Sequence, residues 1–115
     1  MNRRVQFGIA LPQIFPHEPI QTARIRDVLA RAEALNFHSV WVQEQILGPT
    51  PSLEPVDLLA YAAALTRGVR LGSAVLLSTL RSPVHLAKSL ATLDHLSQGR
   101  LIVGVGLGGN TRVYP

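Results

Sequence analysis

The fold is decided by the stretch Val69-Arg70-Leu71-Gly72-Ser73-Ala74-Val75-Leu76-Leu77. It is an apolar run of strand length, apolar on both faces from Ala74 to Leu77, and Gly68 separates it from the helical pattern before it. Ser82 and Pro83 then open a second helical pattern, because serine favours the N-cap of a helix and proline its first position. A strand with two apolar faces between two helices predicts a parallel sheet that is buried on both sides.

Strand and helix patterns alternate on both sides of this stretch. The expected strands cover residues 5–11, 38–42, 69–77 and 101–105, and the expected helices begin near residues 20, 55 and 83. Pro12 ends the first strand because proline cannot donate a hydrogen bond to a ladder, and Asn36 suits the left-handed end of the first helix. The order β-α-β-α-β-α-β predicts right-handed crossovers and parallel strands, and therefore an α/β fold.

The third helix carries an apolar stripe that should face the sheet. We expect its buried residues to be Leu86, Ala87, Leu90, Ala91 and Leu93. Asp94, which follows the stripe, lies at the opposite end of the layer from the strand tips. We expect it to fix the turn into the fourth strand by hydrogen bonds to backbone N–H groups or to Arg100.

The residues alone leave open how the sheet is closed. Such a sheet is either open and doubly wound or a sector of a closed (β/α)₈ barrel. A complete barrel takes about 250 residues, so four strands in 115 residues amount to nearly half of one. The sequence stops just after the fourth strand without a closing helix, so we expect residues 1–115 to form a single partial domain.

Composition argues against several classes of protein. Hydrophobic residues make up 47% of the chain, charged residues make up 16%, and the net charge is 11 − 7 = +4. The cations are scattered and few aromatic residues lie between them, which argues against nucleic-acid binding. No apolar window approaches the roughly 18 residues of a membrane span, and the N-terminus does not resemble a signal peptide. We therefore expect a cytoplasmic protein with no nucleic-acid or membrane partner.

Metal binding is also not indicated. The chain has no cysteine, and its four histidines do not have the spacing of ligands to one ion. His17 alone is expected in a loop at the carboxyl ends of the strands, where it could contact a substrate.

Ligands of parallel α/β sheets bind at the carboxyl ends of the strands, where the loops are free to vary. The segments expected there are Leu11-Pro12-Gln13, Gln43-Glu44-Gln45, Leu77-Ser78-Thr79 and Gly106-Leu107-Gly108. Glu44 and Gln45 place a carboxylate and an amide at this edge, and the two groups could hydrogen-bond a ring system or a substrate. The alternative is that Glu44 caps or pairs locally, as lone polar residues at strand ends commonly do.

The glycines of the fourth strand have two interpretations. Residues 104–109 match the G-x-G-x-x-G spacing of dinucleotide-binding folds, but at the fourth strand rather than the first, and no helix follows. Alternatively, glycines at a strand end remove side chains, so that a flat ligand or neighbouring backbone can come close. We favour the second interpretation.

Several linked motifs run through nearly the whole chain in a fixed order. They are the proline after the first strand, Ser39-Val40-Trp41-Val42 followed by Glu44, the stretch 69–75, Pro83 with Ala87-Lys88, and Leu93-Asp94-x-Leu96-Ser97-x-Gly99-Arg100-Leu101-x-Val103-Gly104-Val105-Gly106. Together they resemble the luciferase-like monooxygenase family, which includes bacterial luciferase, flavin-dependent monooxygenases and deazaflavin-dependent reductases. The last motif is the most specific.

The resemblance implies that the chain is the N-terminal half of a (β/α)₈ TIM barrel. It implies an oxidoreductase or monooxygenase that uses coenzyme F420 or FMN, acts on a small molecule and is a homo-oligomer at full length. A non-prolyl cis peptide would lie at Ala74–Val75, or one bond earlier at Ser73–Ala74, in a bulge that supports the cofactor ring. The implied cofactor-binding residues are Ser73, Ala74, Val75, Gly106 and Gly108, and the implied catalytic residues are Glu44 and Gln45.

Two positions depart from the family pattern. Many members have a histidine where this chain has Gln45, and glutamine can donate a hydrogen bond but cannot exchange a proton near neutral pH. The luciferases proper have a basic residue where this chain has Leu107. The second departure favours the deazaflavin-using branch of the family.

In the family, the residues that bind the cofactor phosphate come largely from later βα loops that this sequence does not contain. We therefore expect the 115-residue chain alone to bind cofactor weakly and to be inactive. The alternative function is a non-catalytic half-barrel that pairs its open edges with a second chain or a second copy. A third possibility, an open doubly wound nucleotide-binding domain, would need a helix after Gly109.

Overall fold

The computed structural model describes residues 4–17 and 19–108. Four strands and three α-helices alternate along them: β1 (Gly8–Ala10), α1 (Thr22–Ala34), β2 (Ser39–Val42), α2 (Pro55–Leu65), β3 (Arg70–Leu77), α3 (Pro83–Leu96) and β4 (Leu101–Gly106), with a short 3₁₀ helix, η1 (Ser78–Leu80), before α3. The strands form one parallel sheet in the order β1-β2-β3-β4. The predicted element order and the parallel sheet are confirmed.

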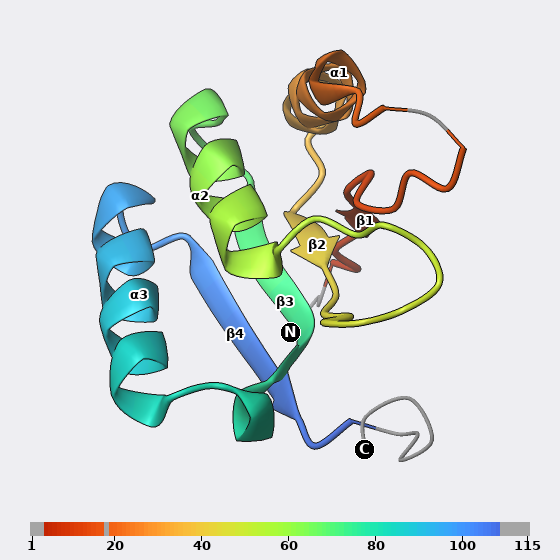
Figure 1. Cartoon of the computed structure of the whole chain (residues 1–115). Helices are drawn as coiled ribbons and strands as arrows, with labels where there is room; N and C mark the ends of the chain where they lie inside the picture. The colour runs from red at the N-terminus through yellow and green to blue at the C-terminus, as the bar shows by residue number, and fades with distance from the viewer. Residues whose placement is uncertain (1–3, 18, 109–115) are drawn as a thin grey trace.

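The three helices cover one face of the sheet, with α2 between α1 and α3 (Figure 1). This arrangement follows from the sequential strand order, because right-handed crossovers that always advance in one direction place every helix on the same side. An open doubly wound sheet needs a reversal of strand order to place helices on both faces. The arrangement is therefore that of a barrel sector.

Local signals set the ends of the helices. Pro55 and Pro83 each lie at the first position of a helix, as predicted. Glu54 caps α2 by accepting a hydrogen bond from the Asp57 N–H at 2.7 Å, whereas Ser82 precedes α3 without a side-chain capping bond. Asn36 adopts a φ of 58° just after α1, which confirms the predicted left-handed end of that helix.

The core lies between the sheet and the helices. Its most buried side chains are Ile25 and Leu29 of α1, Val40 of β2, Leu59 of α2, Leu71 and Leu76 of β3, and Leu93 of α3. The predicted stripe of α3 is wrong in part, since Leu93 is buried, Leu86 and Leu90 are half-buried, and Ala87 and Ala91 are exposed. The main contacts of α3 are with α2, and part of the predicted stripe lies outside them.

The prediction that the strands are buried on both faces is also wrong for the two outer strands. Every residue of β1 is exposed, and β1 is shorter than the predicted 5–11. Val103 and Val105 of β4 are 43% and 57% exposed. In β3, Leu76 and Leu77 are buried but Ala74 and Val75 are exposed. No second layer covers the open sheet face within the described part of the chain.

Arg100 joins β4 to the end of α2 at the amino-terminal edge of the sheet. Its side chain donates to the carbonyl oxygens of Ser97, Val69, Ala63 and Thr66 and to the Thr66 hydroxyl, at 2.7–3.1 Å. These bonds use all five guanidinium N–H groups, and two of them satisfy carbonyls that the end of α2 leaves free. Arg100, which belongs to the motif most specific to the family, therefore has a structural role.

The structure corrects the role predicted for the Asp94 side chain. The turn into β4 is closed by the Gly99 N–H, which donates to the backbone carbonyl of Asp94 at 2.9 Å, and Gly99 has a φ of 76°. The donors of Arg100 go to other groups. The turn is thus fixed by the backbone of Asp94 rather than by its carboxylate.

Glu33 of α1 binds the backbone at the same amino-terminal edge of the sheet, just before β3. Its Oε1 accepts hydrogen bonds from the backbone N–H groups of Arg67, Gly68 and Val69, at 2.8, 2.6 and 3.1 Å. Partial burial favours a higher pKa for this carboxyl, but the three hydrogen bonds and the charge of Arg100 outweigh burial and lower the pKa. Glu33 therefore helps to hold the start of β3.

Candidate functional site

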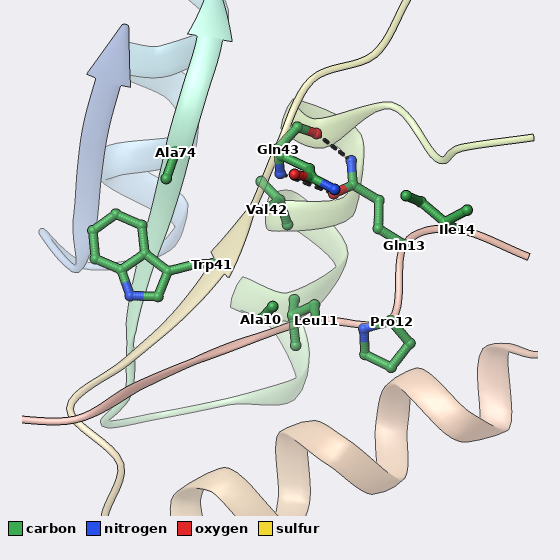
Figure 2. Close-up of a pocket in the computed structure, with 9 residues that line it drawn as sticks. All are labelled: Ala10, Leu11, Pro12, Gln13, Ile14, Trp41, Val42, Gln43 and Ala74. Atoms are coloured by element: carbon green, nitrogen blue, oxygen red, sulfur yellow. Dashed lines mark hydrogen bonds between the residues drawn. The ribbon is translucent and has the colours of Figure 1, made fainter. Parts of the chain in front are cut away.

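A cavity of about 440 Å³ opens at the carboxyl ends of β1, β2 and β3 (Figure 2). Its lining consists of Ala10, Leu11, Pro12, Gln13, Ile14, Trp41, Val42, Gln43 and Ala74. Two glutamines are the only polar residues among them, so the cavity is largely apolar. A mainly apolar cavity with a few polar groups, at this edge of a parallel sheet, has the features of a ligand site.

Trp41 of β2 forms a flat surface on the open face of the sheet. Gly8 of β1 and Gly72 of β3 flank the indole, and a methyl group on Gly72 would lie 2.5 Å from the ring carbons Cε3 and Cζ3. A methyl group on Gly8 would also clash with the ring. The indole N–H donates to the hydroxyl of Ser39 at 2.8 Å. Glycines on both neighbouring strands therefore leave room for the indole.

Gln13 fixes the rim of the cavity. Its amide donates to the carbonyl of Gln43 at 2.5 Å, and its Oε1 accepts from the Gln43 N–H at 2.9 Å (Figure 2). The amide also donates to the carbonyl of Leu53 at 2.8 Å. The residue is 4% exposed. Gln13 thus ties the loop after β1 to the loop after β2. The segment 11–13 was predicted at this edge, but nothing in the sequence marks Gln13 as a separate site residue.

The end of β3 contains the predicted non-prolyl cis peptide, at Ala74–Val75. The pairing of β3 with β4 is irregular between Ser73 and Leu76. Ala74 lines the cavity on the side of Trp41 (Figure 2). Ser73 is buried and its hydroxyl donates to the carbonyl of Gly104 at 3.0 Å and accepts from the Gly104 N–H at 3.1 Å. The Ser73 side chain is therefore bonded to β4 rather than directed to the cavity.

The glycines of β4 leave room for β3. A methyl group on Gly106 would lie 2.6 Å from a methyl of Val75, and one on Gly104 would clash with the carbonyl oxygen of Ser73. Gly108 has a φ of 84° and would present a methyl 3.5 Å from Leu77. The two interpretations of these glycines were a flat ligand and neighbouring backbone, and the close contacts observed are with β3. Gly109, the last glycine of the motif, lies outside the described residues.

Of the five residues predicted to bind cofactor, Ala74 lines the cavity. Val75 is 38% exposed and covers Gly106. The structure therefore brings Ala74 together with Trp41 and brings Ser73, Val75 and the β4 glycines together with one another.

Glu44 lies just beyond the end of β2, with a side chain that is 2% exposed. Its Oε2 accepts from the Leu77 N–H at 2.5 Å, and its carboxylate forms an ion pair with Arg81, which also pairs with Glu54. Burial favours a lower pKa for Arg81, but the hydrogen bonds to the two carboxylates outweigh it and raise the pKa. Glu44 therefore makes the local pairing that was the alternative to ligand contact.

Gln45 and His17 lie apart from the cavity lining. A methyl group on Gly48 would clash with the Gln45 amide, so this side chain lies back over its own loop. His17 is exposed and lines a separate cavity of about 320 Å³ with Ile14 and Arg24, among others. Within residues 4–17 and 19–108, no three or more metal-ligating side chains are grouped, and no helix is long and apolar enough to cross a membrane.

A parallel sheet with all its helices on one face and a cavity at the strand ends defines a sector of a (β/α)₈ barrel. The sequence profile of the family described as luciferase-like monooxygenase matches residues 3–114. The chain belongs to this family, and the resemblance inferred from its motifs is confirmed.

Three similar proteins place the chain within the family. The F420-dependent glucose-6-phosphate dehydrogenase of Kineococcus radiotolerans is 35% identical over 98 residues, which cover 79% of this chain and 28% of that protein. The monooxygenase RslO1 of Streptomyces bottropensis has a structure that matches with a TM-score of 0.73 and 38% identity, over 89% of this chain and 33% of that one. The coenzyme F420-dependent tetrahydromethanopterin reductase of Methanopyrus kandleri matches with a TM-score of 0.76 and 27% identity, over 97% of this chain and 29% of that one. The chain thus spans about a third or less of the length of these relatives.

Proposed function

We propose that this chain supplies the N-terminal half of the barrel of an oxidoreductase that uses coenzyme F420 or FMN. The observation that carries the proposal is the cavity that Trp41 and Ala74 help to line, at the carboxyl ends of the first three strands. Its apolar lining and flat indole suit a planar ring, which needs apolar surface rather than charged groups around it. When bound, such a ring supplies hydride transfer or oxygen chemistry that no side chain provides.

Relatives support F420 as the first choice of cofactor. Two of the three similar proteins are named as F420-dependent enzymes. Leu107 stands where luciferases proper have a basic residue, which also favours a deazaflavin. Ala74 would contact the ring, and Ser73, Val75, Gly106 and Gly108 would support that contact by holding β3 and β4 together.

Gln45 lies on the loop after β2, outside the cavity lining, and would hydrogen-bond a substrate that extends from the cavity to this loop. Its amide can donate and accept, but it does not titrate near neutral pH, so this position supplies no acid-base catalysis. The substrate would be a small molecule, and the complete protein a cytoplasmic homo-oligomer. We further propose that residues 1–115 form one partial domain that is active only as part of a complete barrel.

A chimera tests the proposed function. In it, residues 1–108 replace the matching N-terminal part of the F420-dependent glucose-6-phosphate dehydrogenase of Kineococcus radiotolerans. The chimera should bind F420, detected by the change in F420 fluorescence. Ala74→Phe should weaken binding on the order of tenfold or more, because it overfills the cavity. Ala64→Phe, on the exposed side of α2, which lies between α1 and α3, is the matched control and should have no effect. A well-folded chimera that does not bind F420 or FMN would contradict the proposal.

One observation favours a second candidate, the non-catalytic half-barrel. The outer strands present apolar side chains at both edges of the sheet, with Phe7 67% exposed beside β1 and Val105 57% exposed on β4. Outer strands also carry unpaired backbone groups that can pair with another chain. A second copy that joined β4 to β1 would extend the parallel sheet. A discrete dimer in solution would support this candidate.

A further inference from the structure

The carboxylate of Glu44 is the most completely enclosed acidic group near the candidate site. It accepts a hydrogen bond from the Leu77 N–H at 2.5 Å, and the Nε of Arg81 donates to its Oε1 at 2.9 Å. A second guanidinium nitrogen of Arg81 also donates to Oε1. Both oxygens are therefore occupied, and the side chain is 2% exposed. Such a group is poorly placed to contact a ligand.

Glu44 lies where the pairing between β2 and β3 stops. The ladder between these strands ends at Val42 opposite Ser73. Beyond that point β3 continues to Leu77 and pairs with β4 on its other side. The hydrogen bond from Leu77 to Glu44 continues the connection on the β2 side. A side chain thus takes the place of the strand that has ended.

Arg81 connects this contact to a third element. It follows η1, and its guanidinium pairs with Glu44 and with Glu54, the N-cap residue of α2. Glu54 in turn accepts the Asp57 N–H through its other carboxylate oxygen. A planar guanidinium can hold two carboxylates at once in a fixed geometry, which an ammonium group does less well. The loop after β2, the loop after β3 and the start of α2 are therefore tied at one point.

We propose that Glu44 is a positioning residue of the ring site rather than a catalytic one, and that Arg81 and Glu54 hold it in place. This inference rests on the proposed function. By anchoring Leu77, Glu44 fixes the end of β3, and with it Ala74, at a set separation from Trp41 on β2. Both residues belong to the same side of the cavity lining (Figure 2).

Glu33 provides the control that separates positioning from general stability. It also accepts backbone N–H groups at the edge of β3, but at the amino-terminal end, away from the cavity. Glu33→Gln and Glu44→Gln each remove one charge and keep the shape of the side chain. Loss of stability alone would affect both variants in the same way, whereas loss of positioning would affect the cavity in Glu44→Gln only.

Trp41 reports on the cavity because it is the single tryptophan of the chain. In the full 115-residue chain, the measurements are Trp41 emission, its quenching by acrylamide, and the urea midpoint of unfolding. In native buffer, Glu44→Gln should increase quenching and shift the emission, whereas Glu33→Gln should lower the midpoint without changing either signal. Equal Trp41 signals in the two variants would overturn the proposal.

Two further variants cover the case in which Glu44→Gln does not fold. Glu54→Gln leaves the bond between Leu77 and Glu44 and removes the outer ion pair, so it should change Trp41 quenching in the same direction by less. Arg81→Lys keeps the charge but cannot bind both carboxylates in the same geometry. Its change in Trp41 quenching should lie between those of Glu54→Gln and Glu44→Gln. Unchanged Trp41 signals in both folded variants would overturn the proposal.

The chimera gives an independent readout, which is its affinity for the cofactor. Glu44→Gln should raise its Kd for F420 on the order of tenfold, the usual scale for a lost hydrogen bond to a charged group, whereas Glu33→Gln should leave that Kd unchanged. If the parent chimera binds neither F420 nor FMN, the proposed function fails while the Trp41 result still decides the positioning role. If the parent binds and Glu44→Gln binds equally well, the positioning role fails and the proposed function stands.

Discussion

At the scale of single residues, Gly72 leaves the space on β3 that the Trp41 indole occupies. Gly72→Ala would place a methyl group 2.5 Å from the indole, so the ring or the strand must shift. We expect a loss of about 1–3 kcal/mol in the free energy of unfolding, as for overpacking elsewhere, with a shift in Trp41 emission. Urea unfolding followed by fluorescence measures both effects.

Gly68→Ala is the control for this substitution. A methyl group there would lie 3.8 Å from the Glu33 carboxylate, which is ordinary contact distance, and the Gly68 N–H would still donate. It should leave the midpoint and the emission close to the parent values. A loss in Gly68→Ala as large as that in Gly72→Ala would show that glycine at position 72 matters for reasons other than the indole.

Residues whose role depends on strand register could not be predicted from the sequence. Gly72 lies opposite Trp41 only once the pairing of β2 with β3 is known. The partners of the Gln13 side chain are 30 and 40 residues away along the chain. By contrast, Pro55, Pro83 and Asn36 act through their own backbone conformation, and their positions followed from residue type. Local signals were therefore readable, and contacts between distant strands were not.

At the scale of elements, the amino-terminal end of β3 should become less stable in acid. The pKa of Glu33 is lower in the folded chain than in the unfolded chain. The charged carboxylate therefore contributes its full stability at pH values above the pKa that Glu33 has in the unfolded chain. That contribution is lost as the pH falls through the lowered value. The difference in free energy of unfolding between the parent and Glu33→Gln should be largest at neutral pH and vanish in strong acid.

Urea unfolding at a series of pH values measures this difference. Asp27→Asn, an exposed substitution on the same helix α1, is the control and should give a small difference at all pH values. A difference for Glu33→Gln that stays constant down to strong acid would show that the Glu33 charge does not contribute through these hydrogen bonds.

The elements themselves were largely predictable, but their burial was not. Helical and strand periodicities gave the order of elements because period depends on local geometry. Burial depends on neighbours, so the stripe of α3 and the faces of β1 and β4 were predicted as buried when the described chain leaves them partly exposed. The site follows the same rule. Its position at the strand ends was predicted, but the enclosure of Glu44 by Arg81 was not.

At the scale of the whole molecule, the candidate site has walls on one side only. The cavity lining comes from β1, β2, β3 and the loops that follow β1 and β2, and the open sheet face is uncovered within the described residues. A planar ring held against one wall buries about half of its surface, whereas tight ligand sites bury 70–90% or more. The 115-residue chain alone should therefore show no micromolar affinity for F420 or FMN in a fluorescence titration.

Sedimentation of the same sample distinguishes the two candidate functions. The exposed apolar rows of β1 and β4 should make the isolated chain associate without a defined stoichiometry if its edges normally meet other βα units. A discrete dimer would show instead that two copies cover each other's edges. Micromolar affinity in that dimer would mean that four strands from each copy enclose the ring, and the requirement for a longer chain would then be wrong. Micromolar affinity in a monomer would contradict the argument from burial itself, because one wall would be sufficient.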